Sequence, residues 1–309
     1  MTGESFITQD DGNPEPLDYE VDTDITKHVA EHAGMQLAYR REQQSDDITE
    51  YNIWVPGFFG IHSAYNQLRH EATLLDPHAG NISMHAPRKH DLWHSLSPQN
   101  SLHPSLMLSK AVWGIIKDTA EDTGVQKFNL IGHSMGGPAV VNAATYIQRN
   151  KDGSLLNSVT LNASAGVTNH NIATLAPRAA RLLTDEIRSN WPELSKRVGG
   201  HDRAVATREL IRYMFHRQTF LEMLAVSNCN ILDKIATLSE TVPTAGLFFP
   251  SDPLFDVDRA ERNLSSRVHA FEVMQTPETA GHVAPQLYPA EVAAKNLAVR
   301  QSFGQTQAA

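Results

Sequence analysis

The sequence contains little of what marks several other classes of protein. Only one cysteine, Cys229, occurs in 309 residues, so no disulfide can form within the chain and a reducing compartment is expected. No run of about 18 apolar residues is present, and the N-terminal residues lack the basic start and apolar stretch of a secretory signal. The sequence therefore predicts a cytoplasmic protein without an integral membrane segment.

Basic residues are also scarce. Lysine and arginine total 26 against 35 aspartates and glutamates, which gives a formal net charge of -9, and they form no run. A protein that binds nucleic acid usually presents a basic face. We therefore expect no nucleic-acid partner, and we attribute the acidic balance to solubility.

Sequence motifs for nucleotides and metals are missing as well. The chain has no G-x-G-x-x-G motif and no P-loop. Among its 15 histidines, His90 and His94 lie four residues apart, but without the glutamate of an H-E-x-x-H motif. We therefore expect no cofactor and no metal, while the sequence does not specify an oligomeric state.

Most of the chain alternates short apolar runs with helical patterns, which is typical of βαβ units around a mostly parallel sheet. We expect a flexible acidic tail over 1–24, an α/β core over 25–166 and 241–303, and a C-terminal tail over 304–309. Residues 167–240 show helical periodicity without a convincing strand, so they predict an inserted all-helical cap, or lid.

The core elements expected from these patterns include a hairpin over Ile25–Tyr39 and a buried strand over Tyr51–Gly57 that ends in a glycine loop. The other expected strands are Asn81–His85, Phe128–Ile131, Leu155–Leu161, Val242–Phe249 and Arg267–Met274. The expected helices are Ser63–Leu75, Pro104–Thr123, Pro138–Arg149, Asp256–Asn263 and Pro289–Phe303, with Thr174–Ser189 and Arg203–His216 in the inserted segment.

The strongest chemical signal is the stretch Gly132-His133-Ser134-Met135-Gly136, which fits G-x-S-x-G. This pattern makes a sharp turn from strand to helix and pushes the serine into a strained, exposed position. Glycines beside the turn remove clashes with Cβ atoms. Because a strand is expected before the motif and a helix after it, the context favours Ser134 as a nucleophile.

At this point the chain resembles the α/β-hydrolase family, and the resemblance covers roughly 25–303. The motifs that carry it, in the family's order, are EHAGMQLAYR, VPGFFG, GHSMGG, FFPSDPLF and GHVAPQLYP. In that family the triad runs serine, then aspartate or glutamate, then histidine. The resemblance therefore implies Asp252 as the acid and His282 as the base. Asp256 and Asp258 are rivals for the acid, although they fall at an expected helix start, where carboxylates often cap.

The resemblance also implies an oxyanion hole made of two backbone N–H groups, those of Met135 and Phe58. Phe58 follows Pro56-Gly57, where the family usually has His-Gly, so the chain departs from the family pattern here. We expect Phe59 and His133 to border the substrate pocket. His133 occupies a variable position of the motif, so we expect it to pack beside the turn and not to act as the base.

These residues together predict a hydrolase that cleaves a carboxylic ester through a Ser-His-Asp acyl-enzyme mechanism. The apolar content of the inserted segment suggests a small-molecule substrate with a hydrophobic acyl or alcohol group. The same triad serves C–C bond (β-diketone) hydrolases, thioesterases, amidases, acyltransferases and cofactor-free haloperoxidases. A non-catalytic ligand-binding protein of the same fold is an alternative from a different class.

Overall fold

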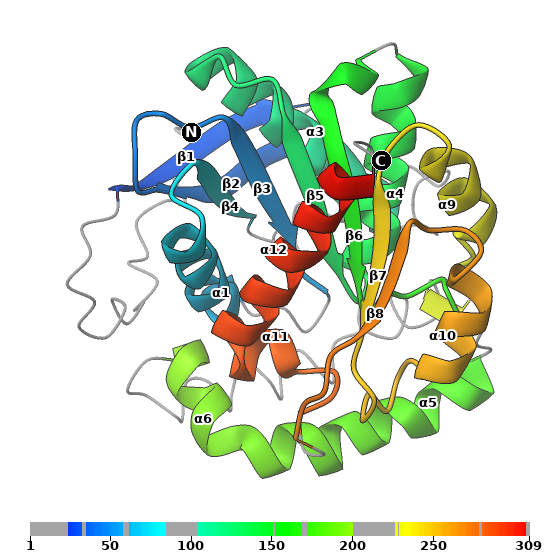
Figure 1. Ribbon diagram of the computed structural model, residues 1–309. Helices are drawn as coiled ribbons and strands as arrows, with labels where there is room; N and C mark the ends of the chain where they lie inside the picture. Colours follow the sequence, from blue (N-terminus) through cyan, green and yellow to red (C-terminus); the bar gives the residue numbers. More distant parts are fainter. Residues whose placement is uncertain are drawn as a thin grey trace, which may run out of the picture.

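The apolar runs of the sequence assemble into one eight-stranded sheet (Figure 1). The computed structural model describes residues 24–32, 35–57, 62–84, 104–150, 152–168, 172–199, 226–227, 229–277 and 280–306. The strands are β1 (Asp24–His32), β2 (Met35–Gln43), β3 (Glu50–Val55), β4 (Ala79–Met84), β5 (Phe128–His133), β6 (Leu156–Asn162), β7 (Thr244–Phe248) and β8 (Ala270–Val273).

The strand order in the sheet is β1-β2-β4-β3-β5-β6-β7-β8. Strand β2 pairs antiparallel with both β1 and β4, and all the pairs from β4 to β8 are parallel. Strands β3, β4 and β5 lie in the middle of this arrangement, and nearly all of their residues are buried because helices cover both faces of a parallel sheet. The mostly parallel sheet flanked by helices confirms the predicted α/β fold class.

Helices flank the sheet on both sides (Figure 1). Helices α1 (His62–Leu75) and α12 (Pro289–Thr306) pack together on one face, and α3 (Pro104–Thr123) and α4 (Gly136–Arg149) pack together on the other. Helix α4 buries an apolar stripe with helical spacing, which includes Val140, Ala144 and Ile147. The shorter helices of the core are η1 (Gly153–Leu155), α9 (Leu232–Ser239), α10 (Val257–Leu264) and α11 (Ala284–Leu287).

The longest described stretch of the segment predicted to form an inserted cap, residues 172–199, is helical throughout. It consists of α5 (Ile172–Arg181), a π-helix η2 (Leu182–Ile187) and α6 (Arg188–Gly199), which together run along the bottom of the view in Figure 1. The helix expected over Thr174–Ser189 is present, but its π-helical turn was not predicted. The helix expected over Arg203–His216 lies outside the described residues.

Two predicted boundaries differ from the structure. Helix α9 falls inside the segment expected to form the cap, yet it packs on α4 and β7 of the core. Periodicity reveals a buried helical face but not the element that buries it, so the sequence does not separate α9 from the helices of the predicted cap. The final helix runs to Thr306, three residues beyond the expected end of the core. The predicted tail over 1–24 lies outside the described residues except for Asp24, which begins β1.

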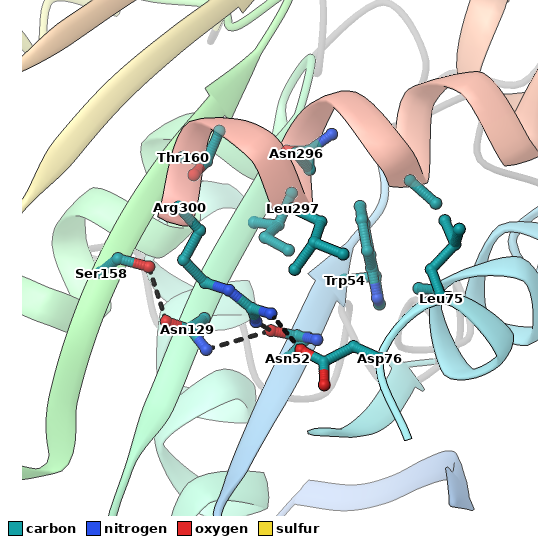
Figure 2. Close-up of a pocket in the computed structure, with 13 residues that line it drawn as sticks. Asn52, Trp54, Leu75, Asp76, Asn129, Ser158, Thr160, Asn296, Leu297 and Arg300 are labelled. Carbon is teal, nitrogen blue, oxygen red and sulfur yellow. Dashed lines mark hydrogen bonds and ion pairs between the residues drawn. The ribbon is translucent and has the colours of Figure 1, made fainter. Parts of the chain in front are cut away.

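A row of polar side chains crosses the amino-terminal half of the sheet, and Figure 2 shows three of its members, Asn52, Asn129 and Ser158. Asn81, Asn52, Asn129 and Ser158 are cross-strand neighbours on β4, β3, β5 and β6, and all four are buried. Their side chains bond in sequence: Asn52 donates to Asn81 at 3.0 Å, Asn129 donates to Asn52 at 3.0 Å, and Ser158 donates to Asn129 at 2.6 Å. Arg300 of α12 donates to Asn52 and to Asp76, which ties the helix to this row. We call these four strand residues the polar ladder.

Candidate active site

Ser134 lies in the turn between β5, which ends at His133, and α4, which begins at Gly136. Its backbone has a φ of 54°, in the left-handed region that costs a residue with a Cβ roughly 1–2 kcal/mol. Three backbone bonds hold it there: its N–H donates to Asn162 at 3.0 Å, and its carbonyl accepts from Gly137 at 3.1 Å and from Ala165 at 3.0 Å. The surrounding chain therefore imposes the strained turn expected of a nucleophilic serine.

His282 lies against the serine. It follows β8 and comes just before α11, and its Nε2 is 3.1 Å from Ser134 Oγ. Its Nδ1 lies 2.8 Å from Oδ2 of Asp252, where an Nδ1–H group donates to the carboxylate. That bond leaves the lone pair of Nε2 directed at the serine hydroxyl, which is the arrangement a general base requires.

Asp252 follows β7 at the carboxyl end of the sheet, and its second oxygen is held by the backbone. Oδ1 accepts from the N–H groups of Leu254 at 2.7 Å and Phe255 at 3.1 Å. Both oxygens therefore have partners, and the carboxylate is fixed in orientation. The loop that carries His282 packs directly on this loop, because a Cβ added at Gly281 would meet the Ser251 backbone at 2.3 Å.

The two rival acids lie elsewhere. Asp256 caps α10, where its Oδ1 accepts from the N–H of Arg259 at 2.8 Å. Asp258 is exposed in the first turn of that helix. The structure therefore brings together Ser134, His282 and Asp252 and leaves the other two carboxylates at a helix start.

The charge environment of His282 favours its protonated form. Burial acts most strongly and lowers the pKa of the imidazole, but the charge and hydrogen bond of Asp252, with a further contribution from Glu186, raise the pKa above its usual value. An imidazolium formed beside Asp252 is therefore stabilised at the position where a proton taken from Ser134 would arrive.

His133 is hydrogen-bonded to the loop that carries His282. Its Nε2–H donates to the backbone carbonyl of His282 at 3.1 Å, and its Nδ1 accepts from the hydroxyl of Tyr65. Burial and the charge of His282 both lower the pKa of His133 well below its usual value, so the ring is neutral. The sequence predicts that His133 borders the substrate pocket. In the structure both nitrogens of its ring are hydrogen-bonded to other residues of the protein.

The expected oxyanion hole is only partly within the described residues. Met135 is the N-cap residue of α4, so its N–H lies at the positive end of that helix. Phe58 and Phe59 lie outside the described residues. Gly57 is described, and a Cβ added there would come within 2.6 Å of Ser134 Cβ, so the loop that leads to Phe58 passes directly beside the serine.

Glu186 is a site residue that the sequence did not indicate. It belongs to the π-helix η2, is only 2% exposed, and accepts the backbone N–H of Val283 at 3.0 Å through Oε2. Burial raises its pKa to about 7, against the opposing effect of the His282 charge. A glutamate within an amphipathic helix normally faces solvent, so no sequence signal marked this one.

Neither a metal centre nor a membrane span is found in the part of the chain that the structure describes. No cluster of three or more histidine, cysteine or acidic side chains there has the spacing to ligate a metal ion. None of the described helices is both long enough and apolar enough to cross a bilayer.

Residues 54–295 match the model of a family described as the alpha/beta hydrolase family. No curated protein sequence matches the chain significantly.

Several solved structures share the fold. A membrane phospholipase A, described as a bacterial virulence factor, superposes with a TM-score of 0.64 at 18% identity, covering 90% of this chain and 86% of the other. A 2-hydroxy-6-oxo-6-phenylhexa-2,4-dienoate hydrolase from Rhodococcus gives 0.61 at 13% identity, covering 91% and 100%. Naproxen esterase from Bacillus subtilis gives 0.55 at 14% identity, covering 89% and 91%. At these identities the likeness concerns the fold alone.

Proposed function

The chain belongs to the alpha/beta hydrolase family, and from that premise we propose that it is a serine hydrolase that cleaves a carboxylic ester through an acyl-enzyme. The observation that carries the proposal is the continuous chain of contacts from Ser134 Oγ to His282 Nε2, and from His282 Nδ1 to Asp252. The order and roles of these groups match those of a nucleophile, a base and an orienting acid.

The chemistry follows from these positions. His282 takes the proton of Ser134 as Oγ attacks the ester carbonyl, and a tetrahedral intermediate with a negative oxygen forms. His282 then gives the proton to the departing alkoxide, so the C–O bond breaks and an acyl group remains on Ser134. Water repeats the two steps, with His282 again as base and then as acid, and releases the carboxylic acid.

Stabilisation of the negative oxygen is assigned to the backbone N–H groups of Met135 and Phe58. The Met135 N–H at the start of α4 supports this assignment, because a helix N-terminus favours negative charge. The position of Gly57 against Ser134 supports it as well, since the next N–H along the chain is that of Phe58. Preorganised donors of this kind contribute about 3–4 kcal/mol each in well-studied hydrolases.

We propose that the substrate is a hydrophobic ester and that the inserted segment forms a cap over the site. Contacts between the segment and both catalytic loops support the cap assignment: Glu186 bonds Val283 of the histidine loop, and Arg178 donates to Leu254 of the acid loop at 3.2 Å. Two of the structural neighbours described above are named for ester cleavage. Substitution of apolar cap residues should reorder substrate preference more than it changes turnover of a small activated ester, because remote contacts set discrimination.

A fluorophosphonate probe tests the nucleophile, and a substrate panel tests the reaction. The proposal predicts covalent labelling at Ser134, located by mass spectrometry of the tryptic peptide, and turnover of p-nitrophenyl esters. Thioesters, amides and β-diketones in the same panel identify the competing reactions of this triad. A correctly folded protein that neither reacts with the probe nor turns over any member of the panel would be a ligand-binding protein, and the proposal would fail.

A further inference from the structure

The inserted segment reaches the catalytic histidine loop through one buried carboxylate. Glu186 is 2% exposed, while its neighbours Thr184, Asp185 and Arg188 are exposed. It lies on the face of the segment that also buries Leu182 and Ile187. A carboxylate on an apolar helix face is costly to bury and normally has a partner or a task there.

The π-helical turn accounts for the inward position. Segment Leu182–Ile187 is π-helical between two α-helices, and a π-helical turn widens the backbone and changes which side chains face inward. Such turns often occur at functional sites. Here the widened turn directs Glu186 and Ile187 together into the protein, although a carboxylate and an isoleucine at adjacent positions would ordinarily differ in exposure.

The contact of Glu186 is with the backbone of the histidine loop. Oε2 accepts the N–H of Val283, the residue after His282, at 3.0 Å, and the backbone N–H of His282 also stabilises the charged carboxylate. No described residue donates to Oε1. The carboxylate therefore has one committed oxygen and one free oxygen in a buried place beside the proposed base.

The charged groups that face Glu186 come from the two catalytic loops. His282 lies on one loop and Asp252 on the other, and the two have opposite effects on the ionisation of Glu186. On its own segment, Asp185 and Arg188 are exposed. Helix α11, which follows the histidine loop, has the sequence APQL and no titratable side chain. His133 contacts the other side of the histidine loop and is neutral.

We propose that Glu186 is a positioning residue for the reaction proposed above, one that fixes the His282 loop from the inserted segment and sets the charge beside the imidazole. The inference rests on the proposed function for its kinetic consequences only. The hydrogen bond to Val283 holds the loop in place, and the negative charge favours the imidazolium that forms when His282 takes the serine proton. Glu186 itself touches neither the substrate nor the reacting atoms.

Two variants separate the hydrogen bond from the charge. Glu186→Gln keeps an oxygen that accepts from Val283 but removes the charge, and Glu186→Ala removes both. Asp185→Asn is the matched control, because it neutralises the adjacent carboxylate, which is exposed. The measurements are kcat and KM against pH on the best ester of the panel, and an NMR titration of the His282 ring proton that requires no substrate.

The expected result has three parts. Glu186→Ala lowers kcat by on the order of 10- to 100-fold with KM little changed, because the base is misplaced while substrate contacts remain. Glu186→Gln recovers most of that loss at the optimum, and it moves the acid limb of the kcat/KM profile and the NMR titration of His282 to lower pH. Asp185→Asn matches the wild type in every measurement.

An unchanged His282 titration in Glu186→Gln overturns the electrostatic half of the inference, and wild-type kcat in Glu186→Ala overturns the positioning half. A variant that only loses thermal stability, with neither change, shows a purely structural residue and also overturns it. Wild-type activity in Ser134→Ala would instead sink the proposed function, and the substrate-free NMR titration would still decide the electrostatic half.

Discussion

Two buried polar networks occupy opposite ends of the same sheet, and they are built in different ways. The polar ladder crosses the amino-terminal halves of the central strands beside α12 (Figure 2), while the proposed triad lies at the carboxyl ends of β5, β7 and β8. In the ladder, Asn52, Asn81 and Asn129 each use both the oxygen and the nitrogen of the side-chain amide. The side-chain amides of the ladder are therefore hydrogen-bonded to other residues of the protein through both of their polar atoms.

The active-site network is bonded less completely. Ser134 keeps a left-handed backbone, Glu186 has an oxygen without a donor among the described residues, and so does Asn162 at the end of β6. A buried polar group without a partner costs about 1–3 kcal/mol. Buried polar atoms without a partner also occur elsewhere among the described residues, and Asn296 of α12 beside the ladder has one. The contrast therefore concerns the ladder residues themselves, whose side-chain amides are satisfied, and the residues around Ser134, where strain and unused bonding capacity occur together.

The strongest test of this contrast is the substitution Ser134→Ala. We expect a loss of at least about 10^4-fold in kcat on the preferred ester, because the nucleophile is removed. The melting temperature should change little, since the three backbone bonds of the turn remain. Kinetics together with thermal unfolding of the same preparation measure both quantities. Near-normal turnover in the folded variant would rule out Ser134 as the nucleophile.

A second large effect is expected at Asp252. Asp252→Asn should lower kcat by on the order of 10^4-fold, because an amide no longer holds His282 in the required tautomer. Asp256→Asn is the matched control: asparagine caps helices as well as aspartate does, so both activity and stability should remain near the wild type. A crippling effect at Asp256 in the same assay would show that the acid loop is misassigned.

A substitution in the polar ladder should lower the stability of the fold and leave turnover unchanged. Asn52→Leu removes the acceptor of Asn129 and Arg300 and the donor to Asn81. We expect a loss of about 3–5 kcal/mol in the free energy of unfolding, since partners of a buried network are left unbonded. Chemical denaturation measures that loss, and kcat/KM per folded molecule should stay unchanged. A variant with normal stability and impaired turnover would reverse the proposed contrast between the two networks.

The sequence was sufficient to predict much of the active-site network and little of the polar ladder. G-x-S-x-G predicts a strained turn at Ser134 from its own glycines, and the resemblance of FFPSDPLF and GHVAPQLYP to the acid and histidine loops of the α/β-hydrolase family implies Asp252 and His282. The ladder needs the register of four strands, β4, β3, β5 and β6, and no local pattern encodes that pairing. Asparagines within apolar strands were therefore not singled out.

Glu186 and α9 show the same limit within the helical segment. Periodicity indicates which residues share a helical face, but a π-helical turn shifts that face, and the inward position of Glu186 depends on the shift. Helix α9 has an ordinary apolar stripe, and only the packed structure shows that α4 and β7 bury it. Propensity and pattern describe an element by itself, whereas these assignments depend on its neighbours.

The smallest expected effect is the pH dependence of stability at Glu186. Burial raises its folded-state pKa to about 7 from 4.5, so the unfolded chain ionises first as pH rises. Protonated Glu186 therefore makes its full contribution to the free energy of unfolding below pH 4.5. That contribution is lost between about pH 4.5 and 7 and does not return at higher pH.

Glu186→Gln lacks this titration. The difference in unfolding free energy between the variant and the wild type should shift in favour of the variant by about 3 kcal/mol as the pH rises across that window. Urea unfolding at several pH values between 4 and 8 gives the two curves, and Asp185→Asn, at an exposed position, should follow the wild type throughout. Parallel curves for Glu186→Gln and the wild type would mean that Glu186 is ionised at no cost in the folded protein, and the active-site network would then be as well satisfied as the polar ladder.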